Sequence, residues 1–565
     1  MKKIVGLFCL MFIFFNASFA QHYTHADTLR GSNGPGRSWW NATKYDLHVK
    51  FNLEDSSISG YNVISFKELK KDHVDYFQID LQKPMIIDSV ILGNKKWRDQ
   101  RWKINFIQDG NAWFINLNDS LKRENTNNKE QLPHKYFIPE SSNLFIYYHG
   151  KPRIAKRPPW DGGITWTRDK QGNPWITITC QGLGASVWYP CKDYQGDEPD
   201  SAEMHITAPS DLIAISNGRM RSKIDNNDGT TTTTWAVVNP INNYDFIPYL
   251  GKYTHFGEIY NGLKGPLTMD YWVLDSNLTK AKKQFKEAPR MMKAFEYWFG
   301  PYPFYEDGYK LVEAPHLGME HQSAVAYGNH FLNGYLGKDL SGTGVGLKWD
   351  FIIVHESGHE WFGNNITSKD IADSWIHEGF TNYSETLFTE YWFGKEDATK
   401  YIVGIRKNIE NKKPIISPYG VNADGPIDIY YKASNMLHTI RQVINNDAIF
   451  RNILRGLNKT FYHKTVTSKQ IEDYISKTSK IDFSKVFDQY LRTIKIPTLE
   501  YSIKAGMLSY RWTSVVPGFN MPVKIYNTKG NLQFIYPKEK PQHLKWNAAQ
   551  LKVDENFYIY TNQIN

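Results

Sequence analysis

Residues 351 to 362 read FIIVHESGHEWF, and this stretch determines how the rest of the chain is interpreted. The pattern H-E-x-x-H places His355 and His359 four positions apart, so on a helix both imidazoles share one face and can bind a single metal ion. Glu356 projects about 100° from His355 around the helix axis, which excludes it as a ligand but lets it reach a water molecule on the metal. The sequence therefore predicts a buried metal site with Glu356 as general base.

A catalytic zinc ion usually has three protein ligands and one open position, so a third ligand is expected. Eighteen residues separate His359 from Glu378, which lies in the segment WIHEGFTNYSE of residues 375 to 385. The combined pattern resembles the aminopeptidase N family of gluzincin metallopeptidases. The resemblance implies one zinc ion per chain, with Glu378 as its third ligand. His377 is not expected to bind the same ion, because adjacent residues of a helix point in different directions.

A second match to the family lies before the metal motif, where residues 317 to 321 read LGMEH and the family has G-x-M-E-N. The first and last residues differ from the family, whereas the central Met-Glu pair is retained. The resemblance implies that Gly318 and Met319 contact the substrate and that Glu320 binds its free amino group. A buried ammonium group needs such a carboxylate, and this requirement distinguishes an exopeptidase from an endopeptidase.

A third match surrounds Gln181, which lies ten residues before Cys191. The segment resembles the family strand in which a Gln or Glu shares recognition of the substrate's amino group, so the resemblance implies that Gln181 assists Glu320. The same segment contains Cys180, and an exported compartment would permit a disulfide between Cys180 and Cys191. Pairing and free thiols both remain open, because sequence alone does not fix their geometry.

Hydrolysis of a peptide bond develops an oxyanion, which needs a hydrogen-bond donor besides the metal. Residues 429 to 433 read IYYKA and resemble the family's Y-x-K-G segment. The resemblance implies that Tyr430, two positions before the lysine, stabilises the oxyanion. Tyr431 is the alternative, and only the spacing favours Tyr430.

Further residues are candidates for positions around the metal. Metal-bound histidines normally donate their second N–H to a carboxylate or a carbonyl group, and Asn382 and Glu385 are candidates for this contact. Asp373 is expected at the surface or behind the ligands. His316 is a candidate for lining the pocket that receives the first side chain of the substrate.

Periodicity divides the chain into three parts. From about residue 45 to 255, apolar and polar residues alternate between short polar turns, which predicts antiparallel strands. Helical spacing dominates from about residue 276 to 495, and alternation returns afterwards. We therefore expect a multidomain α+β fold. The resemblance implies an N-terminal antiparallel β saddle domain over residues 21–255, a thermolysin-like α/β catalytic domain over residues 256–495 and a small C-terminal β module over residues 496–565.

The first twenty residues have the pattern of a signal peptide, with Lys2 and Lys3, an apolar run and the small-x-small sequence that ends at Ala20. Cleavage near Ala20 would export the protein to the periplasm or the medium. Removing this segment lowers the formal net charge from +9 to +7. No cluster of Lys and Arg is interleaved with aromatic residues, so no nucleic-acid partner is expected. No later run reaches the roughly 20 apolar residues of a transmembrane helix.

The expected function is that of a secreted zinc aminopeptidase, whose partners are peptides with a free N-terminus. Zinc would activate water, and Glu356 would take its proton and return it to the leaving amine. Three alternatives stay open: a zinc endopeptidase of the thermolysin type, a family member adapted to hydrolyse an epoxide, and a catalytically inactive peptide-binding protein. The sequence specifies neither the oligomeric state nor the preferred first side chain.

Overall fold

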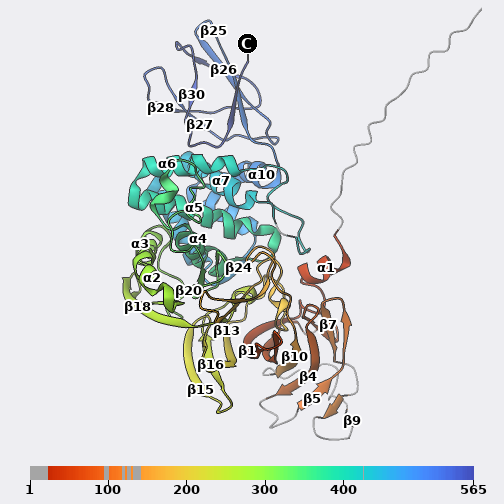
Figure 1. The fold of residues 1–565 in the computed structure, drawn as a ribbon. Helices are drawn as coiled ribbons and strands as arrows, with labels where there is room; N and C mark the ends of the chain where they lie inside the picture. Colours follow the sequence, from red (N-terminus) through yellow and green to blue (C-terminus); the bar gives the residue numbers. More distant parts are fainter. Residues whose placement is uncertain are drawn as a thin grey trace, which may run out of the picture.

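The computed structural model describes residues 23–70, 72–94, 101–117, 121–123, 129–130, 142–423 and 425–564. The signal peptide expected at residues 1–20 lies outside these ranges. Figure 1 shows three regions in chain order: an N-terminal region of strands, a central region of helices and strands, and a C-terminal region of strands. The expected α+β fold is therefore confirmed.

A ten-stranded sheet dominates the N-terminal domain, in the order β15-β16-β13-β1-β2-β10-β4-β5-β8-β9. Within it β1 and β13 run parallel, and the other described pairs run antiparallel. Alternation along β1 buries Tyr45, Leu47 and Val49 in the core and leaves Asp46 and His48 on the outer face. The strands are β1 Trp40–Asn52, β2 Ser57–Glu68, β4 Ile86–Asn94, β5 Arg101–Ile104, β8 Leu121–Arg123, β9 Lys129–Glu130, β10 Ser142–Gly150, β13 Ser201–Pro209, β15 Arg219–Asp225 and β16 Thr230–Val237.

Two smaller sheets complete this domain, in the orders β3-β7-β6 and β11-β12-β17-β14. The segment that follows β12 carries Cys180, whose thiol donates to the Tyr244 carbonyl oxygen at 3.3 Å. Cys180 and Cys191 are both buried and unpaired, so the structure has free thiols at these positions. The strands are β3 Tyr76–Asp80, β6 Phe106–Asp109, β7 Ala112–Asn116, β11 Gly163–Arg168, β12 Pro174–Thr179, β14 Ile213–Ile215 and β17 Tyr249–Gly251.

A short helix, α1 (His25–Gly31), precedes the first strand and was not expected from the sequence. Thr24 caps the start of this helix. The Thr24 hydroxyl accepts a hydrogen bond from the backbone N–H of Asp27, and the Asp27 carboxylate accepts one from the backbone N–H of Thr24. Arg30 donates to the Gly182 carbonyl oxygen at 2.8 Å, and the backbone N–H of Asn422 donates to the Asp27 carbonyl oxygen at 3.0 Å. The helix therefore joins the turn after β12 to a loop of the central domain.

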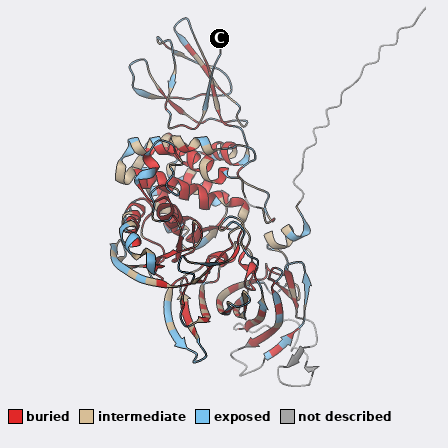
Figure 2. Ribbon diagram, viewed as in Figure 1, coloured by how far each residue is buried: buried red, intermediate tan, exposed pale blue. Residues whose placement is uncertain are grey.

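The central domain is built on a five-stranded sheet in the order β18-β19-β20-β22-β21. The boundary expected at residues 255–256 falls inside β18, which pairs along its length with β19 and so belongs to this sheet. Figure 2 shows that the helices at the centre of this domain are largely buried, and every residue of α4 is buried. The strands are β18 Tyr253–Gly262, β19 Gly265–Leu274, β20 Tyr309–Glu313, β21 Gly318–Met319, β22 Val325–Tyr327, β23 Ile366–Ser368 and β24 Lys464–Val466. The helices are α2 Leu278–Gln284, α3 Glu287–Phe299, α4 Phe351–Gly358, α5 Trp375–Phe393, α6 Lys395–Gly404, α7 Asp428–Ile444, α8 Asp447–Thr460, α9 Ser468–Ser479 and α10 Ser484–Arg492.

The C-terminal domain contains two small sheets, in the orders β29-β26-β25-β31 and β28-β27-β30. It contacts α7 through a hydrogen bond of 2.9 Å between His438 Nε2 and Asn556 Oδ1. Across the described part of the chain, no helix combines the length and apolar composition needed to cross a membrane. The strands are β25 Thr498–Lys504, β26 Met507–Thr513, β27 Val523–Tyr526, β28 Leu532–Ile535, β29 Gln542–Lys545, β30 Lys552–Val553 and β31 Tyr560–Gln563.

Candidate active site

The two helices α4 and α5 bring together the three residues expected to bind a metal. His355 lies in the last turn of α4, His359 directly follows that helix, and Glu378 lies in the first turn of α5. Glu378 Oε2 is 3.7 Å from His355 Nε2 and 3.3 Å from His359 Nε2. Ligand atoms around a tetrahedral zinc ion, with bonds of about 2.0–2.2 Å, lie about 3.4 Å apart, so these side chains are spaced to hold one ion.

The outward-facing nitrogen of each imidazole has its own partner. His355 Nδ1 lies 2.7 Å from Glu385 Oε1, which also accepts a hydrogen bond of 2.8 Å from Asn382 Nδ2. His359 Nδ1 lies 3.1 Å from the Phe362 carbonyl oxygen. Such contacts fix the tautomer and leave Nε2 of each ring free to bind the ion. Of the two candidates for this role, Glu385 contacts the imidazole directly and Asn382 acts through Glu385.

The cavity in front of these residues has a volume of about 360 Å³. Three carboxylates line it, those of Glu320, Glu356 and Glu378, and its described lining contains no Lys or Arg. Glu378 Oε2 is buried without a hydrogen-bond partner. Burial lowers the pKa of His359, but the carboxylates of Glu320 and Glu378 outweigh this effect and raise it to about 9. Buried carboxylates require a compensating cation, so the donor set fits a divalent metal ion.

Glu356 lies in the cavity wall against the edge strand β21. A Cβ atom on Gly318 would lie 2.8 Å from Glu356 Oε1, so only glycine lets the strand backbone approach this carboxylate so closely. Burial raises the pKa of Glu356, although His355 and His359 oppose the shift. Gly318 and the neighbouring Met319 pair with β22 on one side only, which leaves a strand edge on which an extended peptide can lie.

The third carboxylate, Glu320, is held by residues of the N-terminal domain. Gln181 Nε2 donates to Glu320 Oε1 at 2.6 Å and to Glu378 Oε1 at 3.3 Å. The Tyr244 hydroxyl donates to Glu320 Oε1 at 3.1 Å. Glu320 Oε2 lies 4.0 Å from His359 Nε2, and burial raises the pKa of Glu320 to about 7. Sequence reasoning missed Tyr244, because no motif marks the short turn that carries it.

The two adjacent tyrosines of α7 have different neighbours. Tyr430 lies in the first turn of α7, and its ring centroid is 6.1 Å from that of His355. Burial and then the charges of Glu378 and Glu320 raise the pKa of Tyr430. Tyr431 also lines the cavity, but its electrostatic neighbours are Glu385 and Tyr335. Of the two tyrosines, Tyr430 is therefore the one coupled to the carboxylates around the expected metal.

Three other candidates have contacts that give them different roles. His377 Nε2 accepts a hydrogen bond of 2.8 Å from the backbone N–H of Ser368, so this nitrogen is not available as a ligand. Asp373 accepts a hydrogen bond of 3.0 Å from the backbone N–H of Ser468, which fixes the start of α9. His316 is absent from the described lining of this cavity and lines an adjoining cavity of about 410 Å³, which shares Trp160 and Leu317 with it, so its place beside the first side chain of the substrate stays a prediction.

Two family models match the chain. The Peptidase M1 N-terminal domain matches residues 41–244, and the Peptidase family M1 domain matches residues 284–490. Together these matches cover most of the N-terminal and central domains and include Gln181 and the three metal-ligand candidates.

The chain is also similar to several characterised proteins. It is 20% identical to human endoplasmic reticulum aminopeptidase 1 over 371 residues, which cover 64% of this chain and 38% of the relative. It is 28% identical to aminopeptidase N of Lactobacillus helveticus over 222 residues, covering 35% and 25%. It is 23% identical to leukotriene A-4 hydrolase of Xenopus laevis over 341 residues, covering 56% and 52%. The chain thus spans between a quarter and about half of the length of these relatives.

Solved structures share the fold. An M1 zinc metallopeptidase variant from Deinococcus radiodurans, bound to a Tyr-Ser-Ala substrate, superposes with a TM-score of 0.64 at 18% identity, covering 81% of this chain and 95% of that one. The M1 zinc metallopeptidase of the same organism gives a TM-score of 0.63 at 18% identity, covering 79% and 92%.

Proposed function

This chain belongs to peptidase family M1, and we propose that it is a zinc aminopeptidase that hydrolyses the first peptide bond of peptides with a free N-terminus. The observation that carries the proposal is the position of Glu320. Its carboxylate lies beside the expected metal ligands and is held there by Gln181 and Tyr244. A carboxylate in this position can bind an ammonium group next to the bond that is cleaved.

We propose one zinc ion per chain, held by His355, His359 and Glu378. The spacing of their atoms and the unpartnered Oε2 of Glu378 support this assignment. Zinc bound here would supply Lewis acidity, which lowers the pKa of a water molecule and polarises a carbonyl group. Glu385 and the Phe362 carbonyl hold the two imidazoles in the required orientation.

The residues around the metal have separate tasks in the proposed reaction. Glu356 takes the proton of the attacking water at its carboxylate and then gives it to the leaving nitrogen. The Tyr430 hydroxyl donates a hydrogen bond to the oxyanion that develops on the carbonyl oxygen. The substrate backbone lies along the free edge of β21, at Gly318 and Met319, which keeps the carbonyl carbon in line with the water.

The position at which the substrate's ammonium group binds determines which peptide bond is cleaved. Glu320 Oε2 is 4.0 Å from His359 Nε2. When the substrate's ammonium group binds Glu320, the first peptide bond of the substrate therefore lies beside the metal. Gln181 orients Glu320 by donating to its Oε1. A zinc endopeptidase would need this end of the cleft to accept an uncharged chain, and the buried Glu320 carboxylate opposes that.

We also propose that the protein is exported after cleavage near Ala20. The support is the sequence pattern of the first twenty residues. The intact mass of protein recovered from the medium or the periplasm tests this, and a mass that includes residues 1–20 would contradict it.

The activity is tested with paired aminoacyl reporters, one with a free amino group and one acetylated. We expect cleavage of the free reporter only, complete loss with a chelator and recovery on addition of zinc. Glu320→Ala should lower kcat/KM for the free reporter by about 100-fold, because the ammonium loses its buried partner, while the metal content stays the same. Cleavage of acetylated peptides at internal bonds would instead indicate the endopeptidase.

A further inference from the structure

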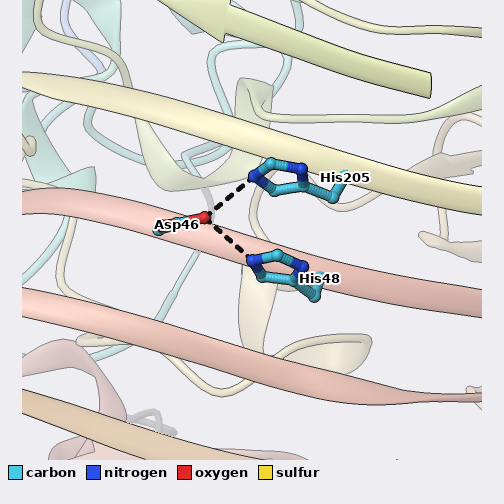
Figure 3. A group of neighbouring side chains, drawn as sticks. All are labelled: Asp46, His48 and His205. Carbon is cyan, nitrogen blue, oxygen red and sulfur yellow. Dashed lines mark ion pairs between the residues drawn. The ribbon is translucent and has the colours of Figure 1, made fainter. Parts of the chain in front are cut away.

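A second group of metal-binding side chains lies on the ten-stranded sheet of the N-terminal domain (Figure 3). Asp46 and His48 belong to β1, and His205 belongs to β13. The parallel register places Asp46 opposite Glu203 and His48 opposite His205. Because alternate residues of a strand face the same side, two carboxylates and two imidazoles meet on the outer face of the sheet.

The three atoms that converge in Figure 3 have the spacing of metal ligands. His48 Nε2 and His205 Nε2 each lie 3.1 Å from the same oxygen, Oδ1 of Asp46. Ligand atoms around a tetrahedral ion lie about 3.4 Å apart. Glu203 Oε1 lies 3.6 Å from His205 Nε2, and the other oxygen of Glu203 forms an ion pair of 2.9 Å with Lys44 Nζ.

Neighbouring residues hold both rings with Nε2 toward Asp46. His205 Nδ1 is 2.9 Å from the Thr234 hydroxyl, and His48 stacks on Tyr61 with ring centroids 4.2 Å apart. A contact at Nδ1 that leaves Nε2 free is the usual arrangement behind a metal-bound histidine.

This group differs from the ordinary His–Asp pairs of the same protein. His149 with Asp88 and His255 with Asp270 form directed hydrogen bonds of 2.7 and 2.8 Å. Asp46 Oδ1 is shielded from solvent and accepts no well-directed hydrogen bond, although two ring nitrogens lie 3.1 Å away.

We propose that Asp46, His48 and His205 form a second site for a divalent transition metal ion of the zinc type. Imidazole and carboxylate ligands suit zinc, and side chains that are between 22% and 33% exposed give the ion access from solvent. The two rings are stacked with their centroids 4.0 Å apart, so both turn a ring nitrogen toward Asp46 (Figure 3).

The site links the two parallel strands of the sheet. β1 leads toward β2, β10 and β4, whereas β13 leads toward β16 and β15. An ion bound across them holds the two halves of the sheet together and stabilises the folded chain by mass action. This role is independent of peptide hydrolysis and does not rest on the proposed function.

The test measures zinc stoichiometry on the full chain. After removal of loosely bound metal, the protein is titrated with zinc chloride in a calorimeter and the total zinc is measured by mass spectrometry. We expect two zinc ions per wild-type chain and one in His205→Gln or Asp46→Asn. His355→Ala should also retain one, which is the ion on the sheet. Added zinc should raise the melting temperature of wild type and His355→Ala but not of His205→Gln.

A matched control removes a histidine of an ordinary pair. His255→Gln should still bind two zinc ions, because that imidazole has a single carboxylate partner. His205→Gln should melt at the wild-type temperature without added zinc, which separates loss of the ion from misfolding. Cobalt(II) added to protein that keeps only its tightly bound zinc ion should give visible absorption bands that His205→Gln lacks. A wild-type stoichiometry of one, or two ions retained in both His205→Gln and Asp46→Asn, would overturn the proposal.

Discussion

The protein has two clusters with the same minimal composition, two histidines and a carboxylate, in different surroundings. In the candidate active site, His359 and Glu378 have side chains only 1% and 3% exposed, whereas those of His48 and Asp46 on the sheet are 31% and 33% exposed. The buried imidazoles come from one short stretch of helix, but the exposed ones come from two strands distant in sequence. Composition alone therefore does not define a catalytic centre, which also needs burial, fixed outer contacts and a separate base.

The largest effect is expected from Glu356, which has no counterpart in the sheet cluster. Glu356→Gln should lower kcat/KM for a free aminoacyl reporter by about 10³-fold, because an amide does not accept the proton of water. The zinc content should be unchanged, since Glu356 is not one of the expected ligands. Steady-state kinetics and metal analysis of the same preparation check both points. Activity within tenfold of wild type would show that another group acts as the base.

The outer contacts of the two clusters should differ in strength. Glu385→Gln should weaken zinc binding at the candidate active site by about 10- to 100-fold, because the charge behind His355 is lost. Thr234→Val, the matched change behind His205, should weaken only the sheet site, and by less, because a neutral hydroxyl is lost. Competition with a coloured chelator measures both affinities. Equal losses would remove the distinction between the clusters.

A smaller effect is expected from the hydroxyl of Tyr244. Tyr244→Phe should lower kcat/KM about tenfold by removing one of the hydrogen bonds to Glu320, the equivalent of about 1.4 kcal/mol. Tyr189→Phe is the control, because its hydroxyl donates to the nearby Asn243 carbonyl oxygen rather than to Glu320. Similar losses in both variants would indicate a general disturbance of this turn. Kinetics with free aminoacyl reporters distinguish these outcomes.

The smallest effect on hydrolysis is expected from the sheet cluster. His48→Gln should change kcat/KM by less than about twofold, because sites that share no partner residues usually act independently to within about 0.5 kcal/mol. The reporter assay checks this under zinc-replete conditions. A loss of tenfold or more would show that the two clusters are coupled.

Sequence reasoning reached the residues whose positions depend on local spacing. His355 and His359 are neighbours in space because a helix repeats every 3.6 residues, and Glu378 followed from the resemblance to the M1 family. The α+β fold was predictable because the spacing of apolar residues changes from the alternation of strands to the period of helices near the middle of the chain, and back again near residue 496. The chemical roles of these residues stay predictions until the variants are measured.

Residues whose positions depend on tertiary structure were not predictable in this way. Tyr244 reaches Glu320 from a short turn of another domain, and no local pattern specifies that approach. The pairing of His48 with His205 depends on the parallel register of β1 and β13, which nothing in either strand alone determines. Helix α1 was not predicted either. It has seven residues, and helical periodicity becomes recognisable only over a window of about 11–18 residues.

The contacts of α1 also set an order of events during synthesis. This helix is made first, yet the Asn422 backbone that donates to Asp27 is made almost 400 residues later. At about 5–20 residues per second, the helix waits roughly 20–80 seconds for this partner. The helix can therefore join the two domains only after most of the central domain has been translated.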